Sequence, residues 1–161
     1  MSLKKINQEK LWNVLLINLP ITLVLCLFAQ LLSVLEGKVA GFSVGQFLLN
    51  LPVAYLAATV IGLALPSVPW GMRFAARCGA KPESLSYALL VNVVVNTVYT
   101  LLLSVIMTFV NVSLLAHGPL IAVVFGILTN FVPLWFACYL VSFFSAPPCR
   151  KLASRLAGTR T

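Results

Sequence analysis

The chain has 161 residues, of which 61% are hydrophobic and only 9% are charged. A soluble domain is about 45–50% apolar and about 25% charged, so the composition excludes a water-soluble fold and predicts an integral membrane protein. A net charge of +8 could suggest a nucleic-acid partner. The basic residues flank apolar segments instead of forming a separate domain, however, so we expect no binding to nucleic acid.

Four apolar segments follow one another, each long enough to cross a hydrocarbon core of about 30 Å. The first, residues 11–35, carries no charge and is longer than a signal-peptide core, so we expect a retained helix. A turn at 36–46 leads to a second span at 47–65. After a basic segment the third span covers 85–110, a turn follows at 111–119, and the fourth span covers 120–145. The prediction is an all-α bundle of two hairpins, residues 1–80 and 81–161.

Each hairpin ends in a segment with the same order of residue types. A proline is followed by basic residues four positions apart and then by a glycine, which is typical of a short helix with a defined start and stop. We therefore predict two amphipathic helices at the membrane surface. Their basic residues are expected to contact anionic lipid head groups, and these residues are Arg73, Arg77, Lys151 and Arg155.

The basic residues also predict the orientation in the membrane. Of the eleven Lys and Arg residues, only Lys38 falls on the side of the bundle opposite the two termini. Because Lys and Arg near span ends stay in the cytoplasm, both termini are expected to be cytoplasmic. The compact chain is typical of a multi-pass protein of the bacterial inner membrane.

Polar residues of the first and third spans pair at one offset, which indicates an internal repeat. The matched residues lie 78 positions apart and are Asn18 with Asn96, Thr22 with Thr100, Cys26 with Ser104, and Gln30 with Thr108. Asn130 follows Asn50 by 80 positions, which implies a small insertion in the second outer turn. Both hairpins enter from the same side, so we predict a parallel repeat about an axis along the membrane normal.

The repeated unit resembles a small bacterial membrane family. The likeness is carried by the segment from Asn50-Leu51-Pro52 to Arg77, and more weakly by the segment from Asn130 to Arg155. The unit is similar to the two-helix hairpins of the domain-of-unknown-function family numbered twenty-seven ninety-eight. That family has no assigned activity, so the resemblance implies a fold and leaves the function open.

The polar residues inside the spans are the candidate functional residues. They are expected to face the bundle interior, where they either hold helices together by hydrogen bonds or line the path of a solute or ion. For the path we select Asn18, Thr22, Asn50, Asn96, Thr100 and Asn130. Prolines follow three of the asparagines closely. The carbonyls that these prolines free either coordinate a solute at a broken helix or bond to the neighbouring asparagine.

Absences narrow the function further. No Asp or Glu lies within the four predicted spans, which argues against carboxylate-based antiport. The single histidine, His117, and four cysteines without a CxxC pair predict no metal site and no cofactor. We expect no enzyme, but a transport-related or channel-like module for a small neutral or weakly charged solute. The alternative is a structural or accessory protein without a ligand, which forms a homo-oligomer or partners another membrane protein.

Overall fold

The computed structural model describes residues 3–158, with side chains from residue 8 onward. In that range all regular elements are helices: α1 (Leu3–Leu35), α2 (Val44–Ala64), α3 (Ser67–Arg77), α4 (Leu85–Thr108), the π-helix η1 (Phe109–Leu115) and α5 (Leu120–Leu156). Four stretches are long and apolar enough to cross a membrane, namely Gln8–Leu35, Val44–Ala64, Leu85–Leu115 and Leu120–Leu156. The prediction of four helices with the length and apolar composition of membrane spans is confirmed.

Local capping explains where the shorter helices begin and end. The Ser43 and Ser84 hydroxyls accept hydrogen bonds from the backbone N–H groups of Gln46 (3.3 Å) and Tyr87 (3.2 Å), so each serine caps a helix start. Leu65, the residue before Pro66, has extended backbone angles and closes α2. Gly79 has a φ of +75°, a conformation that suits glycine, and it follows the end of α3.

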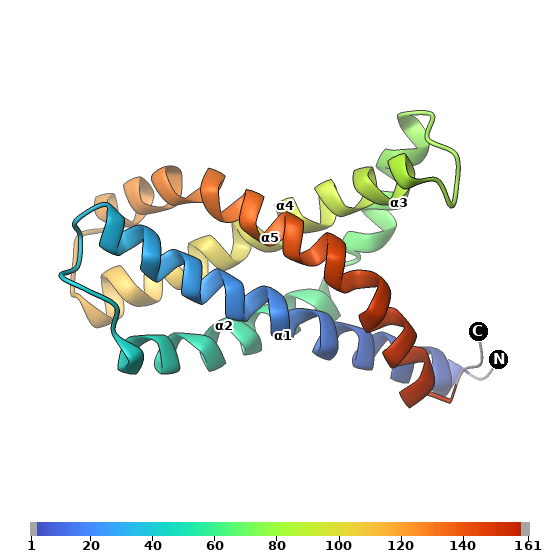
Figure 1. Ribbon diagram of the computed structural model, residues 1–161, viewed down its shortest axis with the longest axis horizontal. Coiled ribbons are helices and arrows are strands. Elements are labelled where there is room, and N and C mark those ends of the chain that lie inside the picture. Colours follow the sequence, from blue (N-terminus) through green and yellow to red (C-terminus); the bar gives the residue numbers. More distant parts are fainter. Residues whose placement is uncertain (1–2, 159–161) are drawn as a thin grey trace.

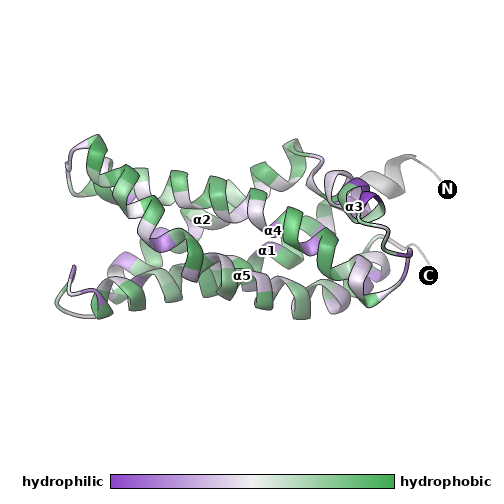
Figure 2. Ribbon diagram, turned by 90° about the horizontal axis from the view of Figure 1, so that it is seen from above, coloured by the Kyte–Doolittle hydropathy of each residue, from purple (hydrophilic) through white to green (hydrophobic). Residues whose placement is uncertain are grey.

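The four long helices form a bundle in which α1 and α4 lie diagonally opposite each other (Figure 1). α1 packs against α2 and α5, and α4 packs against the same two helices and against α3. The connections at 36–43 and 116–119 lie at one end, which we call the loop end. The start of α1, the end of α5, and α3 lie at the other, which we call the basic end. Hydrophobic residues cover most of the length of the long helices (Figure 2).

The bundle core combines small residues of α2 with larger side chains of its neighbours. Ala54 and Ala58 are fully buried, and Gly62 lies so close to α1 and α4 that a Cβ there would clash with the hydroxyl of Tyr99 and meet Val14 at 2.9 Å. Small residues let helix backbones approach closely, which is how helices pack in a membrane. α2 is therefore held tightly between α1 and α4 in this region.

The first predicted surface helix is present, and the second is not a separate helix. α3 buries Gly71 and Ala75 and exposes Arg73 and Arg77, as expected for an amphipathic helix. The segment that holds Lys151 and Arg155 instead continues α5, which runs unbroken through its prolines to Leu156 and bends in its last third (Figure 1). A proline bends a helix without ending it where packing compensates for the lost hydrogen bond.

Two further boundaries differ from the sequence prediction. Residues 111–115, predicted as part of a turn, belong to η1, because the Ala116 N–H donates to the Asn111 carbonyl five residues earlier at 3.1 Å. α1 begins at Leu3, well before the predicted start of its apolar span, so the polar residues before 11 extend the helix at the basic end.

Candidate functional site

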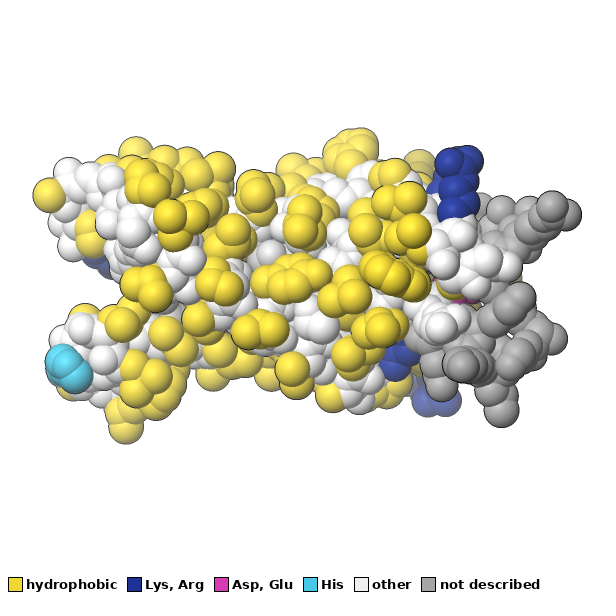
Figure 3. All heavy atoms as spheres, turned by 90° about the horizontal axis from the view of Figure 1, so that it is seen from below, with side chains coloured by type: hydrophobic (Ala, Val, Ile, Leu, Met, Phe, Trp, Pro, Cys, Tyr) yellow, Lys and Arg dark blue, Asp and Glu magenta, His cyan; other side chains and the backbone are white. Residues whose placement is uncertain are grey.

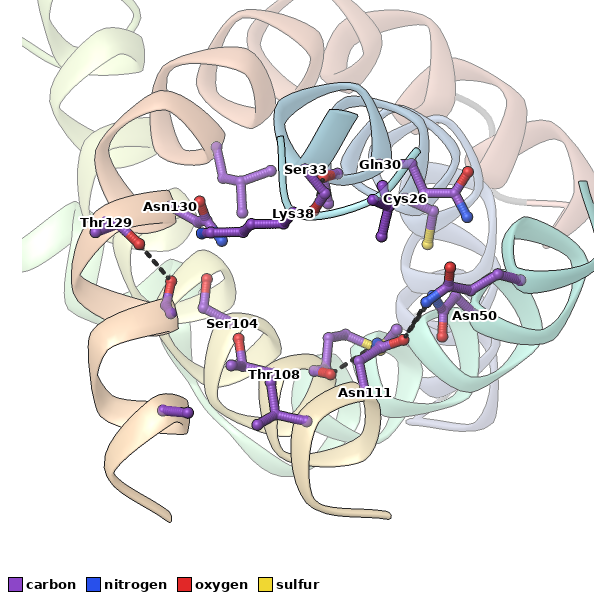
Figure 4. Close-up of a pocket in the computed structure, with 18 of the residues that line it drawn as sticks. Cys26, Gln30, Ser33, Lys38, Asn50, Ser104, Thr108, Asn111, Thr129 and Asn130 are labelled. Atoms are coloured by element: carbon purple, nitrogen blue, oxygen red, sulfur yellow. Dashed lines mark hydrogen bonds between the residues drawn. The ribbon is translucent and has the colours of Figure 1, made fainter. Parts of the chain in front are cut away.

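A pocket of about 640 Å³ lies between the two hairpins at the loop end. The hairpin ends part at this end of the molecule, where His117 lies (Figure 3). Figure 4 shows side chains from all four long helices around the cavity. The polar and charged residues that line it are Gln30, Ser33, Lys38, Gln46, Asn50, Ser104, Thr108, Asn111, Thr129 and Asn130.

The pocket reaches deep into the bundle. Its innermost lining residues include Leu25 on α1 and Leu134 on α5. At 1.5 Å per residue they lie about 15 Å below the end of α1 and about 20 Å below the start of α5, respectively. A hydrocarbon core is about 30 Å thick, so the cavity extends to roughly the middle of the apolar region.

Three lining side chains have a buried polar atom without a hydrogen-bond partner: Gln30 Oε1, Ser104 Oγ and Asn130 Oδ1. Gln30 is 8% exposed, and its Nε2 donates to the Ser43 carbonyl at 3.1 Å, whereas its amide oxygen is unpaired. Buried polar groups are nearly always paired, and an unpaired one destabilises the protein by about 1–3 kcal/mol. All three atoms lie beneath the surface of the cavity, so a ligand or water reaches them only if neighbouring side chains move.

Asn111 connects the rim of the pocket. Its Oδ1 accepts hydrogen bonds from Gln46 Nε2 (3.2 Å) and Asn50 Nδ2 (3.1 Å), and its Nδ2 donates to the Met107 carbonyl (2.8 Å). One side chain of η1 thus holds two side chains of α2. π-Helical turns occur frequently at functional sites, and here the turn places Asn111 at the rim.

Lys38 is the charged lining residue, and its Nζ forms an ion pair with Glu36 in the same connection. None of the pocket residues within the described chain is Asp or Glu. In the same part of the chain, no group of three or more His, Cys, Asp or Glu side chains could hold a metal ion. The pocket is thus a polar, nearly uncharged cavity with apolar walls.

Only two of the six residues predicted for a solute path line this pocket. Asn50 and Asn130 do so, whereas the other four lie one or two helical turns below Cys26 and Ser104, towards the basic end. These four side chains are at most 3% exposed, and they are Asn18, Thr22, Asn96 and Thr100.

The deeper polar residues differ in their bonding. Asn96 Nδ2 donates to the Trp135 carbonyl of α5 at 2.9 Å, and Thr100 Oγ1 donates to Asn96 Oδ1 at 3.4 Å. Thr22 Oγ1 donates to the Asn18 carbonyl within α1 at 2.7 Å. The Asn18 side chain, fully buried, has no partner for either polar atom. Asn96 thus links two helices, whereas Asn18 links none.

The side-chain amides of two of these asparagines do not bond to the carbonyls that the nearby prolines free. Asn50 Nδ2 donates to Asn111 Oδ1, and Asn18 Nδ2 has no partner, so neither donates to a carbonyl freed by Pro52 or Pro20. The hydrogen bonds of the described residues therefore give no support to the interpretation that these asparagines satisfy an opened backbone.

The sequence does not single out five of the pocket residues, namely Ser33, Lys38, Gln46, Asn111 and Thr129. A signal for Asn111 was present, because it lies seven residues after Ser104 and so shares the face of the polar stripe on α4. The other four lie in a connection, near a helix end or at an exposed position. Whether these residues line the pocket depends on how the two hairpins diverge at the loop end. No local sequence pattern predicts that divergence.

A second, smaller cavity of about 270 Å³ lies on α3 and is lined by Trp70, Arg73, Phe74 and Arg77. Arg73 and Arg77 are one helical turn apart and exposed, and Trp70 is 42% exposed beside them. Lys151 is also exposed, as is Arg155, on the tail of α5. Lys and Arg side chains gather towards the basic end (Figure 3). Two basic surfaces thus lie at the end of the bundle away from the pocket.

Comparisons with known proteins yield no relative: no protein-family model, no curated protein and no solved structure matches the chain. The site is therefore interpreted from its own geometry.

Proposed function

We propose that the chain is a multi-pass protein of the bacterial inner membrane that takes up a small neutral or weakly charged solute in the loop-end pocket, as a transport-related or channel-like module. The observation that carries this proposal is a cavity of about 640 Å³ that is lined by polar side chains from all four long helices. A bundle that only needed cohesion would fill this space with side chains, because the walls of a cavity lose packing contacts. The deeper polar residues would continue the path when the helices separate.

The rival function, a structural or accessory protein without a ligand, is favoured by a different observation. Asn96 and Asn50 both form hydrogen bonds between helices, to α5 and to η1. Such bonds are worth about 0.6 kcal/mol each in a membrane protein. The bonds of Asn50 and Asn96 are those of a protein whose asparagines hold helices together. The side-chain oxygens of Asn18 and Asn130 are unpaired and hold no helices together.

The proposal includes the parallel repeat and the cytoplasmic termini. Support for the repeat comes from burial, because Asn18 and Asn96 are 0% and 3% exposed, and Thr22 and Thr100 are 0% and 1% exposed. The diagonal placement of α1 and α4 also fits an axis along the bundle. Support for the orientation comes from the basic surfaces at one end. The resemblance to the hairpin family and the boundary near residue 80 remain predictions.

Cysteine labelling tests whether water reaches the pocket. In a chain whose four native cysteines are replaced by serine, Thr129→Cys places a thiol on the pocket wall, and Leu128→Cys places one on the neighbouring face of α5, where Leu128 is 67% exposed. A membrane-impermeant, positively charged methanethiosulfonate reagent added to intact cells is expected to label Thr129→Cys at least tenfold faster, because a thiol reacts as thiolate, which forms in water.

The outcomes are distinct. Equal labelling of the two thiols, or none, contradicts a water-accessible pocket and favours the structural alternative. Labelling of Thr129→Cys only in inverted vesicles would keep the pocket and reverse the proposed orientation.

We also propose that anionic lipid head groups bind at the two basic surfaces. Each basic residue near a membrane surface contributes about 1 kcal/mol to this attraction. Replacing Arg73, Arg77, Lys151 and Arg155 by Gln is therefore expected to lower the amount of anionic lipid that copurifies with the protein. Native mass spectrometry after reconstitution in an equal mixture of phosphatidylglycerol and phosphatidylcholine measures this. The Lys38→Gln variant, at the loop end, serves as the control, and unchanged retention in the fourfold variant contradicts the proposal.

A further inference from the structure

Most polar groups on the pocket wall are bonded within the chain or lie beneath the surface. The hydroxyls of Ser33 and Thr129 donate to backbone carbonyls one turn earlier in their own helices, at 3.0 and 2.8 Å. The amide nitrogens of Gln46 and Asn50 donate to Asn111. The three unpaired atoms described above lie beneath the surface of the cavity. The wall therefore offers few hydrogen bonds to a ligand.

The rest of the wall is apolar and comes from every side of the cavity. Leu25 lies on α1, Val39 in the connection between α1 and α2, Met107 on α4, and Phe125 and Leu134 on α5. Apolar surface is more favourable against another apolar group than against water. The part of a ligand that fills this cavity is therefore apolar.

The cavity has the length of one lipid chain and is too narrow for a helix. It extends from Val39 at the loop end to Leu25 and Leu134, about 15–20 Å along the helices, and half of a hydrocarbon core is about 15 Å thick. Spread over that length, its volume of about 640 Å³ gives a mean cross-section of about 30–45 Å². A helix with its side chains is about 10–12 Å across, which is an area of about 80–110 Å². A partner helix is thereby excluded, whereas a single flexible chain fits.

The mouth of the cavity is placed for a lipid head group. Lys38 lines the pocket, and it is the one Lys or Arg residue in the two connections at this end. It pairs with Glu36, and the two side chains are 48% and 33% exposed, so both charges are accessible. Below the mouth, side chains from all four long helices surround the cavity (Figure 4). A lipid with two chains would have to pass the second chain between these helices, so a lipid with one chain fits best.

We propose that the loop-end pocket holds the apolar chain of a single-chain membrane lipid, with its head group beside Lys38 and its chain end near Leu25 and Leu134. This inference rests on the proposed uptake of a solute, and it names the chemical class. The lipid exchanges with the surrounding bilayer, and it need not cross the membrane.

Photo-crosslinking in the full-length protein in lipid nanodiscs tests this placement. Two probes of palmitoyl-lysophosphatidylcholine carry a diazirine, one near the head group and one near the chain end. The zwitterionic head group is chosen because the ion pair at the mouth has no net charge. Peptide mass spectrometry is expected to find chain-end adducts on Leu25 or Leu134 and head-proximal adducts on Val39 or Ile121. Leu25 and Leu134 are 3% and 6% exposed, so a probe in the surrounding bilayer does not reach them.

Competition shows which part of the lipid binds. An excess of unmodified lysophosphatidylcholine is expected to reduce the adducts on Leu25 and Leu134 at least about fivefold, because the chain supplies the apolar surface that fills the cavity. Glycerophosphocholine, which is the same head group without the chain, should leave these adducts unchanged.

Filling the cavity should remove the lipid. Ala29→Trp places a large side chain on the pocket wall, and Leu27→Trp is the matched control, since Leu27 lies on the same helix, is 38% exposed and lies outside the pocket. Only Ala29→Trp is expected to lower the chain-end adducts, by at least about fivefold, because the chain loses its space. Thermal unfolding checks that each variant is folded. Thr129→Trp, with Leu128→Trp as its control, repeats the test from the opposite wall.

Two results overturn the inference. One is chain-end adducts only on lipid-facing side chains such as Leu23, and the other is adducts on Leu25 and Leu134 that persist with the competitor or in both filled variants. Reaction of Thr129→Cys with the thiol reagent, measured without added lysolipid, does not depend on the ligand's chemistry. If that thiol is labelled and the pocket adducts are absent, the pocket and the proposed function stand while the ligand class is wrong.

Discussion

Replacing Asn18 by leucine is expected to stabilise the bundle. The Asn18 side chain is fully buried, and neither its oxygen nor its nitrogen has a partner. An unsatisfied buried polar group destabilises a protein by about 1–3 kcal/mol, and leucine is similar in size but has no polar atom. The free energy of unfolding in mild detergent, measured by titration with sodium dodecyl sulfate, should therefore rise by about 2 kcal/mol.

The same substitution at Asn96 is expected to act in the opposite direction. Asn96 donates to the Trp135 carbonyl and accepts from Thr100, so Asn96→Leu removes two bonds of about 0.6 kcal/mol each. The two asparagines occupy matched positions in the predicted repeat, which makes each the control for the other. If Asn18→Leu destabilises the protein as much as Asn96→Leu does, Asn18 serves cohesion and the interpretation as part of a solute path loses its support.

Replacing Asn111 by leucine is expected to loosen the contact between α2 and η1. Asn111→Leu removes three hydrogen bonds, worth about 2 kcal/mol together at the membrane average, and leaves the amide nitrogens of Gln46 and Asn50 without their acceptor. The start of α2 should then separate from η1. Amide hydrogen exchange followed by mass spectrometry is expected to rise in residues 44–50 and 109–115, while exchange in α3 stays the same.

Ser113→Ala provides the comparison within the same π-helix, because the Ser113 hydroxyl is buried and has no partner. It should leave the exchange rate of residues 44–50 unchanged, and the free energy of unfolding should stay the same or rise, because a buried hydroxyl without a partner is removed. Similar exchange in the two variants would mean that Asn111 does not hold the rim of the pocket together.

The sequence predicts the fold where one physical requirement dominates. Apolar segments without charge must cross the membrane as helices, since no water can satisfy the backbone there, and the four spanning helices follow. The burial of Asn18 and Asn96 follows in the same way, because a polar side chain avoids lipid. α3 is predictable because Pro69 and Gly79 mark its approximate limits.

Prediction fails where tertiary packing competes with local preference. Pro147 and Pro148 indicate a helix boundary, yet α5 continues because Ala153 and Ser154 are buried against the rest of the bundle. Asn111 is typical of a turn, but its bonds to α2 are possible only when the hairpins are assembled. The pocket arises from the way the hairpin ends diverge, which depends on contacts between segments far apart in the chain.

The π-helix η1 lies where the two halves of the proposed repeat differ in length. On the proposed repeat, the second hairpin holds two residues more than the first between its matched polar positions, Thr108 and Asn130, which correspond to Gln30 and Asn50. η1 occupies that interval, and a π-turn holds more residues than an α-turn. On this proposal the two halves differ at the pocket rim, where only the second holds Asn111, and at the basic end, where α3 is a separate helix and the tail of α5 is not. The buried polar positions between these ends keep the offset of 78.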